Sequence, residues 1–509
     1  MKDTQKSSSY TSAFIAIVFT FFFWGFVAAS NGILIPTLKK YFALSISQSQ
    51  LVDTAFYIAY FVGSVIYVIL SSTFGDPINK IGYKKGLIIG LFISAAGAFM
   101  FIPAVNTASY ILFLSGLFTI GLGFALLQIV ANPFVINLGD PSKGSHRLNL
   151  AGGINSLGTT IGPVILGYVL SKSVESSAQT TDVHALKTLY AALGVVLLIL
   201  AAVIFVAKIP AIKTDISSTS DIGDLHAIKR KSVFDYPQLT LGMLAIFIYV
   251  GTEVTIQSIM GVWLEDNQIK EIGRSVITNH SETAKFISLY WGSLMIGRMS
   301  GAMGSFDLKK TKYIALSIII PFLVFGIIIL ANSIKDMMPQ IANGSFDFNS
   351  FYNIFTGYIS EFRIYTIWII FFILIKFLGQ EKPSRTLVLF GLAAMAFMLL
   401  GLFSTGSIAL FSFISGGLFC SVMWPCIFNL AIAGLGKHTN RGSSLLIMMI
   451  LGGALIPILQ GKLAESIGIH MSYWIPFVGF AYLAWYGFKA RRILQKQGID
   501  YDASIGAGH

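Results

Sequence analysis

The chain has 509 residues, of which 55% are hydrophobic and only 11% are charged. Because soluble domains carry about 25% charged residues, this composition excludes an ordinary soluble enzyme and predicts a protein embedded in lipid. The formal net charge is +12 at pH 7. In a membrane protein, an excess of Lys and Arg indicates basic cytoplasmic loops rather than a nucleic-acid partner.

Fourteen apolar segments are long enough to cross a bilayer, six before a polar stretch and eight after it. The first also resembles a signal peptide, but its length favours retention as a membrane helix. The predicted spans cover residues 12–38, 50–73, 86–104, 108–138, 148–171, 187–209, 237–263, 284–304, 312–332, 363–380, 386–404, 407–434, 443–461 and 472–488.

The polar stretch divides the chain into predicted domains. Residues 1–209 form an N-terminal six-helix bundle, 210–236 a cytoplasmic linker, 237–488 a C-terminal bundle and 489–509 a cytoplasmic tail. With both termini in the cytoplasm, most Lys and Arg residues fall in cytoplasmic segments, as the positive-inside rule requires. Residues 333–361 are then predicted to form a long external loop.

Two motifs near the ends of the fourth and twelfth predicted spans are related. Pro133 and Asn137 recur at the same spacing as Pro425 and Asn429. Repeated bundles are common in secondary transporters, so the repeat indicates an internal duplication. Chance similarity is the alternative.

Short motifs occur along most of the chain at residues 131–134, 147–151, 251–254, 434–437 and 452–457. In combination they resemble those of the fucose, galactose and glucose cation symporters, a family of the major facilitator superfamily. The resemblance implies an all-α polytopic membrane protein with two pseudo-symmetric six-helix bundles.

Members of this family usually have twelve spans, whereas we predict fourteen. The simplest account is a helical hairpin inserted after the eighth span, at about residues 312–380. An even insertion preserves the predicted side of every later loop.

The loop between the second and third spans resembles a degenerate form of the superfamily's cytoplasmic G-x-x-x-D-R-x-G-R-K motif. Such a loop pairs charged side chains with helix ends and holds neighbouring helices in one conformation. A merely solvated basic turn is the alternative. The residues of the predicted conformational latch are Gly75, Lys80, Gly82, Lys84, Arg147, Arg298 and Arg441.

Glu253 is the one carboxylate predicted to lie deep within a span. A charge at the centre of a membrane helix costs about 2.5–3.5 kcal/mol on insertion scales, so its presence indicates a function. We expect Glu253 to bind the coupling cation, Na⁺ or a proton; a structural ion pair with Arg298 is the alternative. Asp53 is a second, weaker candidate for cation coupling, and a helix-start or interfacial aspartate is the favoured interpretation.

The resemblance also identifies a departure from the fucose branch of the family. Acidic residues in its first and fourth spans are implicated in substrate and proton handling, and Gly32 and Gln128 occupy those positions here. Neither side chain can titrate, so that proton mechanism cannot be carried over intact. The glucose and galactose branch fits better around Glu253.

A neutral sugar presents hydroxyl groups that donate and accept hydrogen bonds, together with an apolar ring face. Amide side chains can meet the first requirement and aromatic rings the second. For each amide, a hydrogen bond between helices is the alternative. The predicted substrate-binding residues are Trp24, Asn31, Gln128, Asn155, Gln257, Trp291 and Asn429.

We therefore expect a secondary active transporter that imports a hexose or related sugar by cation symport with alternating access. An uncoupled sugar facilitator, a carrier of an amino sugar or disaccharide, and a membrane sugar sensor are the alternatives. No nucleophile motif or metal-spaced histidine pair occurs, so we predict no enzyme activity, catalytic residue, metal site or cofactor. The expected partners are the sugar, the cation and the lipid bilayer, without nucleic acid. We expect a monomer in a bacterial cytoplasmic (inner) membrane.

Overall fold

All regular structure that the computed structural model describes is helical. The described residues are 2–74, 77–137, 144–176, 184–207, 232–266, 280–303, 309–380, 382–435 and 439–499. Within these ranges no β-strand occurs, and eleven helices are long and apolar enough to cross a membrane. The predicted all-α membrane fold is therefore confirmed.

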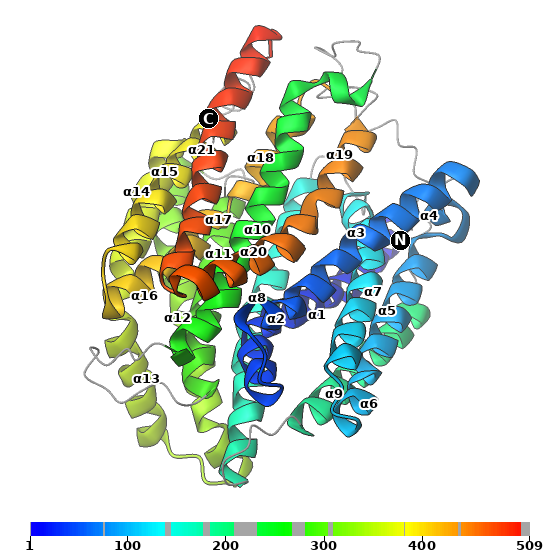
Figure 1. Cartoon of the computed structure of the whole chain (residues 1–509). Helices are drawn as coiled ribbons and strands as arrows, with labels where there is room; N and C mark the ends of the chain where they lie inside the picture. Colours follow the sequence, from blue (N-terminus) through cyan, green and yellow to red (C-terminus); the bar gives the residue numbers. More distant parts are fainter. Residues whose placement is uncertain are drawn as a thin grey trace.

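The six predicted spans of the first half coincide with α1, α3, the pair α5 and α6, α7, α8 and α9. In the interior of this half, α1 packs along α8, and α7 packs between α3 and α5 (Figure 1). The helices are α1 (Lys2–Tyr41), α2 (Ile46–Ser49), α3 (Leu51–Phe74), α4 (Pro77–Ile81), α5 (Tyr83–Phe99), α6 (Phe101–Asn106), α7 (Tyr110–Asn137), α8 (Gly144–Ser176) and α9 (His184–Val206).

Glycines allow α1 and α8 to approach closely. A Cβ atom at Gly158 would lie 2.0 Å from the carbonyl oxygen of Phe22, and one at Gly162 would lie 2.5 Å from that of Phe26. Small residues at helix crossings are typical of membrane proteins, in which lipid gives helices no hydrophobic reason to associate. These glycines thus set the separation of the two helices.

Each of the eight predicted spans of the second half coincides with one helix or with consecutive helices, so the structure is consistent with fourteen spans. Three of the fourteen, α3, α11 and α21, are not among the eleven long apolar helices. The elements are η3 (Val233–Asp235), α10 (Pro237–Asp266), α11 (His280–Ala302), α12 (Lys310–Ala342), α13 (Phe348–Phe362), η6 (Arg363–Tyr365), α14 (Thr366–Gly379), α15 (Pro383–Leu402), α16 (Gly406–Ile414), α17 (Gly416–Cys420), α18 (Met423–Ile432), α19 (Thr439–Met448), η8 (Met449–Leu451), α20 (Gly452–Ile467), η9 (Met471–Tyr473) and α21 (Trp474–Lys496).

The prediction of a long external loop at residues 333–361 was wrong. Helix α12 continues to Ala342, and α13 begins at Phe348, which leaves only residues 343–347 as a connection. The carboxylate of Asp347 caps α13 by accepting hydrogen bonds from the backbone N–H groups of Asn349 and Ser350 at 3.2 and 2.8 Å. Polar residues that suggested a loop therefore lie at a helix end.

A stripe of aromatic residues also explains why α13 is helical. Phe351, Phe355, Tyr358 and Phe362 recur at intervals of four, three and four residues, the spacing of one helix face. The rings of Phe351 and Phe355 stack at 6.0 Å, and those of Tyr358 and Phe362 lie 5.7 Å apart.

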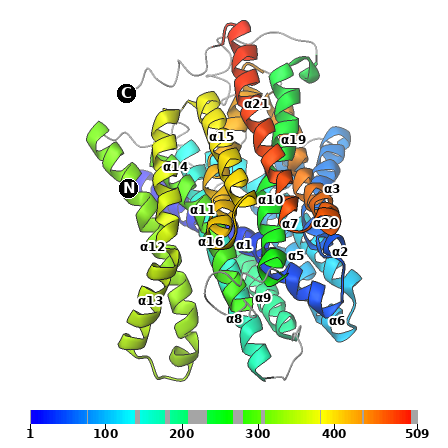
Figure 2. The same cartoon turned by 60° about the vertical axis from the view of Figure 1, so that its left-hand side comes forward.

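Two lysines, one on α11 and one on α14, connect α11 to the hairpin formed by α12, α13 and α14. The Nζ atom of buried Lys285 lies 2.8 Å from Oε1 of Glu361 on α13. On the other side, Lys376 of α14 donates to the backbone oxygen of Ser300 at 2.9 Å. Figure 2 shows α12, α13 and α14 at one edge of the molecule.

The twelfth and thirteenth spans are interrupted helices. Residues 406–432 form three short helices, α16, α17 and α18, and α19 leads through η8 into α20. At the start of α20, a Cβ atom at Gly452 would lie 1.7 Å from the carbonyl oxygen of Phe247. The glycine therefore permits the backbone of α20 to touch α10.

Candidate functional site

The first buried polar cluster is centred on Glu253 in α10. Atom Nη2 of Arg298 on α11 lies 3.2 Å from Oε1 of Glu253. The same guanidinium donates through Nη1 to the Ser156 hydroxyl on α8 at 3.0 Å. Since α8 belongs to the first half of the chain and α10 and α11 to the second, Arg298 connects the carboxylate to the opposite half.

Two further hydrogen bonds fix the helices around this cluster. The Tyr290 hydroxyl donates to the backbone oxygen of Glu253 at 2.6 Å and so holds α11 against α10. Asn155, the neighbour of Ser156, donates through Nδ2 to the backbone oxygen of Phe21 at 2.9 Å. This amide nitrogen therefore makes the bond between helices that the sequence left as an alternative to sugar binding.

The second buried cluster is centred on Asp53 in the first turn of α3. Its Oδ1 atom accepts a hydrogen bond from Nδ2 of Asn31 on α1 at 2.9 Å. Its Oδ2 atom contacts the hydroxyl of Ser258 on α10. Ser258 in turn accepts a hydrogen bond from Nε2 of Gln257 at 3.0 Å. Three helices therefore contribute side chains to this cluster.

Asp53 is buried inside the protein. Asp53 does lie near a helix start, as expected, but its exposed fraction is 0%. The cause is tertiary packing, because α1 and α10 supply the residues that cover the first turn of α3.

The crossing of α1 and α10 gives a structural reason for glycine at position 32. A Cβ atom at Gly32 would lie 2.2 Å from Oε1 of Gln257, and one at Gly261 would lie 2.5 Å from the backbone oxygen of Gly32. An acidic side chain at this position would displace the Gln257 amide. The chain instead places a carboxylate nearby from α3.

The Asp53 cluster lies where the two halves of the chain touch. Thr54 donates through its hydroxyl to the backbone oxygen of Ala454 on α20 at 2.8 Å. The backbone N–H of Ser47 donates to Oε1 of Glu465 at 2.7 Å, and α2 lies against α20 in both views (Figures 1 and 2). We call the part of the molecule held by these contacts the α2–α20 end.

Four predicted sugar-binding residues belong to neither cluster among the described residues. Gln128 on α7 and Trp291 on α11 are buried, whereas Trp24 on α1 and Asn429 on α18 are half-buried. The Trp24 ring centroid lies 5.5 Å from that of Phe21. The structure thus brings together Glu253 with Arg298, and Asn31, Asp53 and Gln257 with one another.

Two predicted latch residues, Lys80 and Lys84, make contacts within the first half, whereas Arg298 belongs to the Glu253 cluster and also contacts α8. The ammonium of Lys80 donates to the backbone oxygen of Phe74 at the end of α3, and Lys84 donates to that of Ala207, just after α9, at 2.9 Å. Gly82, between α4 and α5, adopts a φ of 82°, which favours glycine. Gly75 and the side chains of Arg147 and Arg441 lie outside the described residues.

Ser258 was missed by the sequence analysis. A signal existed, because residues 252–258 contain five polar side chains in the middle of an otherwise apolar span. Ser258 follows the predicted ligand Gln257 directly, but only the fold shows that it faces Asp53, which lies 205 residues away in the sequence.

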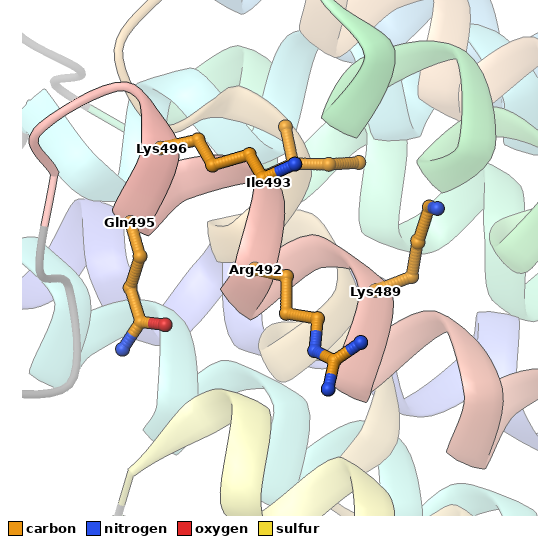
Figure 3. A pocket seen from close by; sticks show the side chains of 5 residues that line it. All are labelled: Lys489, Arg492, Ile493, Gln495 and Lys496. Atoms are coloured by element: carbon orange, nitrogen blue, oxygen red, sulfur yellow. The ribbon is translucent and has the colours of Figure 1, made fainter.

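A surface hollow lies apart from both clusters, on the last helix. It is lined by Lys489, Arg492, Ile493, Gln495 and Lys496, all from the C-terminal part of α21 (Figure 3). The Arg492 guanidinium lies 4.1 Å from the ring centroid of Phe488. With basic side chains from a single helix, this hollow lacks the buried polar groups of the two clusters.

The sequence and the fold are both similar to those of known proteins. The chain matches the sequence profile of the Major Facilitator Superfamily over residues 13–357. The chain belongs to this superfamily. It is 31% identical to a glucose/galactose transporter of Brucella abortus, with 95% of both chains covered. It is 28% identical to the L-fucose-proton symporter of Escherichia coli, with 94% of this chain and 93% of the other covered.

Among solved structures, the chain is similar to the superfamily transporter FucP in its outward conformation. The two share 26% identity and a TM-score of 0.57 over 95% of this chain and 99% of FucP. The resemblance to the fucose, galactose and glucose cation symporters is confirmed, as is the superfamily fold. The protein is an integral membrane transporter and not an enzyme.

Proposed function

We propose that this transporter imports a hexose or related sugar of the glucose, galactose or fucose type together with Na⁺ or a proton. The names of its relatives support the substrate class, since they include a glucose/galactose transporter and an L-fucose-proton symporter. We further propose a bacterial inner membrane as its location, with both termini in the cytoplasm, a monomeric state, and alternating access by two rocking bundles on either side of the 210–236 linker.

The observation that carries the proposal is the bridge made by Arg298. This residue pairs with Glu253 at 3.2 Å and donates to Ser156 in the other half of the chain at 3.0 Å. A sugar hydroxyl or a cation that binds beside Glu253 competes with these partners. Because the bridge joins the two halves, such competition alters the relative stability of the two orientations.

Coupling between the cation and the sugar then follows if both ligands have different affinities for the inward and outward orientations. If Glu253 or Asp53 binds the cation while the amides and aromatic rings bind the sugar, joint binding favours the switch, and a half-loaded carrier switches less readily. The proposed sugar ligands are Trp24, Asn31, Gln128, Asn155, Gln257, Trp291 and Asn429. The proposed latch residues are Gly75, Lys80, Gly82, Lys84, Arg147, Arg298 and Arg441.

Transport assays in proteoliposomes test this proposal. Proteoliposomes that contain the purified full-length chain but no sugar receive labelled glucose, galactose or fucose outside, and entry of the label is followed while Na⁺ and pH gradients are varied independently. A second set of vesicles, preloaded with the unlabelled sugar, measures counterflow. A coupled importer accumulates at least one sugar only when a cation gradient is present. An uncoupled facilitator equilibrates the sugar regardless of the gradient, and a sensor moves none.

The variant Glu253→Gln separates coupling from permeation. We expect it to reduce gradient-driven accumulation by a larger factor than it reduces counterflow, because the amide keeps the shape of the carboxylate but not its charge. Ser156→Ala is the companion variant, since it removes the bond to the other half but leaves the ion pair. Concentrative uptake by Glu253→Gln at the wild-type level would refute a coupling role for Glu253.

A further inference from the structure

Asp53 is a buried carboxylate that forms no ion pair with any residue in the described part of the chain. The ion pairs formed among the described residues are Lys285 with Glu361, Arg298 with Glu253, and Lys335 with Asp336. The neighbours that the structure gives Asp53 are the neutral side chains of Asn31 and Ser258. A carboxylate buried in the protein interior is costly unless a counter-charge accompanies it, so this position favours a bound cation.

Two further oxygen atoms in the same cluster lack a hydrogen-bond donor among the described residues. They are Oδ1 of Asn31 and Oε1 of Gln257, and both residues have an exposed fraction of 0%. The orientation of each amide is fixed by its nitrogen, which donates to Asp53 in one case and to Ser258 in the other. The two unpaired oxygens are therefore hydrogen-bond acceptors, and each belongs to an amide whose nitrogen is hydrogen-bonded within the Asp53 cluster.

The Ser258 hydroxyl cannot donate a hydrogen bond to both of the acceptors that it contacts. It lies 2.7 Å from the backbone oxygen of Val254 and also contacts Oδ2 of Asp53. A hydroxyl carries one hydrogen, so one of these two acceptors receives none from it. The cluster therefore has more buried acceptors than hydrogens directed at them.

We propose that Asp53, Asn31, Gln257 and Ser258 form a Na⁺ site. Carboxylate, amide and hydroxyl oxygens are the ligands that hard cations prefer, and one monovalent cation would also neutralise the single carboxylate. A water molecule could donate to both unpaired oxygens but would leave the charge unbalanced. This inference deepens the proposed symport function, on which it rests, by assigning the cation and its ligands.

The ligands come from both halves of the chain, and this gives the site a mechanical consequence. Asn31 and Asp53 lie on α1 and α3, whereas Gln257 and Ser258 lie on α10. The complete set exists only while α10 is packed against α1 and α3 at the α2–α20 end. Na⁺ therefore stabilises the conformation in which this end is closed, because a ligand favours the state that binds it more tightly.

Thermal unfolding of the purified full-length carrier tests the site without measuring transport. Tm is measured while NaCl replaces KCl or choline chloride at constant ionic strength. We expect Na⁺, but neither K⁺ nor choline, to raise the Tm of the wild type in a saturable manner. For Asp53→Asn, the half-saturating Na⁺ concentration should rise by at least about tenfold.

Three other variants make the test specific. Ser258→Ala removes one ligand with minimal change of shape and should weaken the response to Na⁺ even if Asp53→Asn does not fold. Ser333→Ala is its matched control, because Ser333 is also buried and also donates to a carbonyl four residues earlier, but on α12. Ser333→Ala should keep the wild-type half-saturating concentration. Glu253→Gln tests the other carboxylate proposed for the cation.

Three outcomes would overturn the site. They are an unchanged Na⁺ response in both Asp53→Asn and Ser258→Ala, loss of the response in Glu253→Gln alone, and a wild type that responds to pH but not to Na⁺. Sugar counterflow by the wild type is measured in parallel. A specific Na⁺ response without movement of any sugar would uphold the site while rejecting the proposed substrate class.

Discussion

The ammonium of Lys285 lies 2.8 Å from the carboxylate of Glu361, and this pair joins α11 to the hairpin formed by α12, α13 and α14. The Lys285 side chain is 6% exposed and that of Glu361 is 26% exposed. Glu361→Gln should therefore lower Tm, at a cost of about 3 kcal/mol or less, because it removes the carboxylate that faces a buried ammonium.

The double variant Lys285→Met with Glu361→Leu provides the comparison. Replacing both charges with apolar groups is often nearly neutral, so the double variant should unfold closer to the wild type than Glu361→Gln does. Thermal unfolding of all three proteins in one detergent measures the difference. Equal Tm values for Glu361→Gln and the wild type would mean that the pair does not hold the hairpin.

The spacing of α1 and α8 can be tested with two glycines of the same helix. At Gly158 a Cβ atom would lie 2.0 Å from the backbone oxygen of Phe22, whereas at Gly152 no atom lies within 4 Å. Gly158→Ala should sharply reduce the yield of folded protein. Gly152→Ala should retain it and gain up to about 1 kcal/mol from lower backbone entropy in the unfolded state. Size-exclusion chromatography of the detergent-solubilised variants reports the folded fraction.

The bridge made by Arg298 predicts an order of stability among its variants. Arg298→Gln leaves the buried Glu253 carboxylate without its cation and should lower Tm. Breaking a fully buried ion pair costs about 3–5 kcal/mol, and this pair should cost less because the Arg298 side chain is only half-buried. Adding Glu253→Gln removes the unpaired charge and should recover part of the loss. If the double variant were less stable than Arg298→Gln alone, ion pairing would not explain the effect.

The cap of α13 should show a dependence on pH. Hydrogen bonds from the Ser350 side chain, and then from the backbone of Ser350 and Asn349, lower the pKa of Asp347 below its ordinary value of 3.8. Because the folded-state pKa is lowered, the stabilisation is complete above the unfolded-state pKa of 3.8 and is lost as the pH falls through the folded-state pKa. The Tm difference between the wild type and Asp347→Asn should thus be constant at neutral pH and shrink below about pH 4. A difference that is unchanged at acid pH would argue against the cap.

The helical scaffold could be predicted because each span carries its own signal, a long apolar run bounded by polar residues. Residues 333–361 were misassigned because the amphipathic α13 has too many polar residues for such a run, although its aromatic stripe has helical spacing. The burial of Asp53 could not be predicted, since it depends on Ser258 and Asn31, which are distant in the sequence. Local patterns identify candidate polar residues, but only helix packing pairs them.

Helix α11 carries Tyr290 and Arg298 toward the interior and Lys285 and Ser300 toward the hairpin. Any displacement of α11 that follows ligand binding is therefore shared by α12, α13 and α14, which are anchored to it at two depths. Their outer faces expose apolar residues such as Leu323, Ile370 and Leu374. If α11 moves during transport, the lipids along this edge must rearrange with it, and turnover should then depend on bilayer thickness and acyl-chain order.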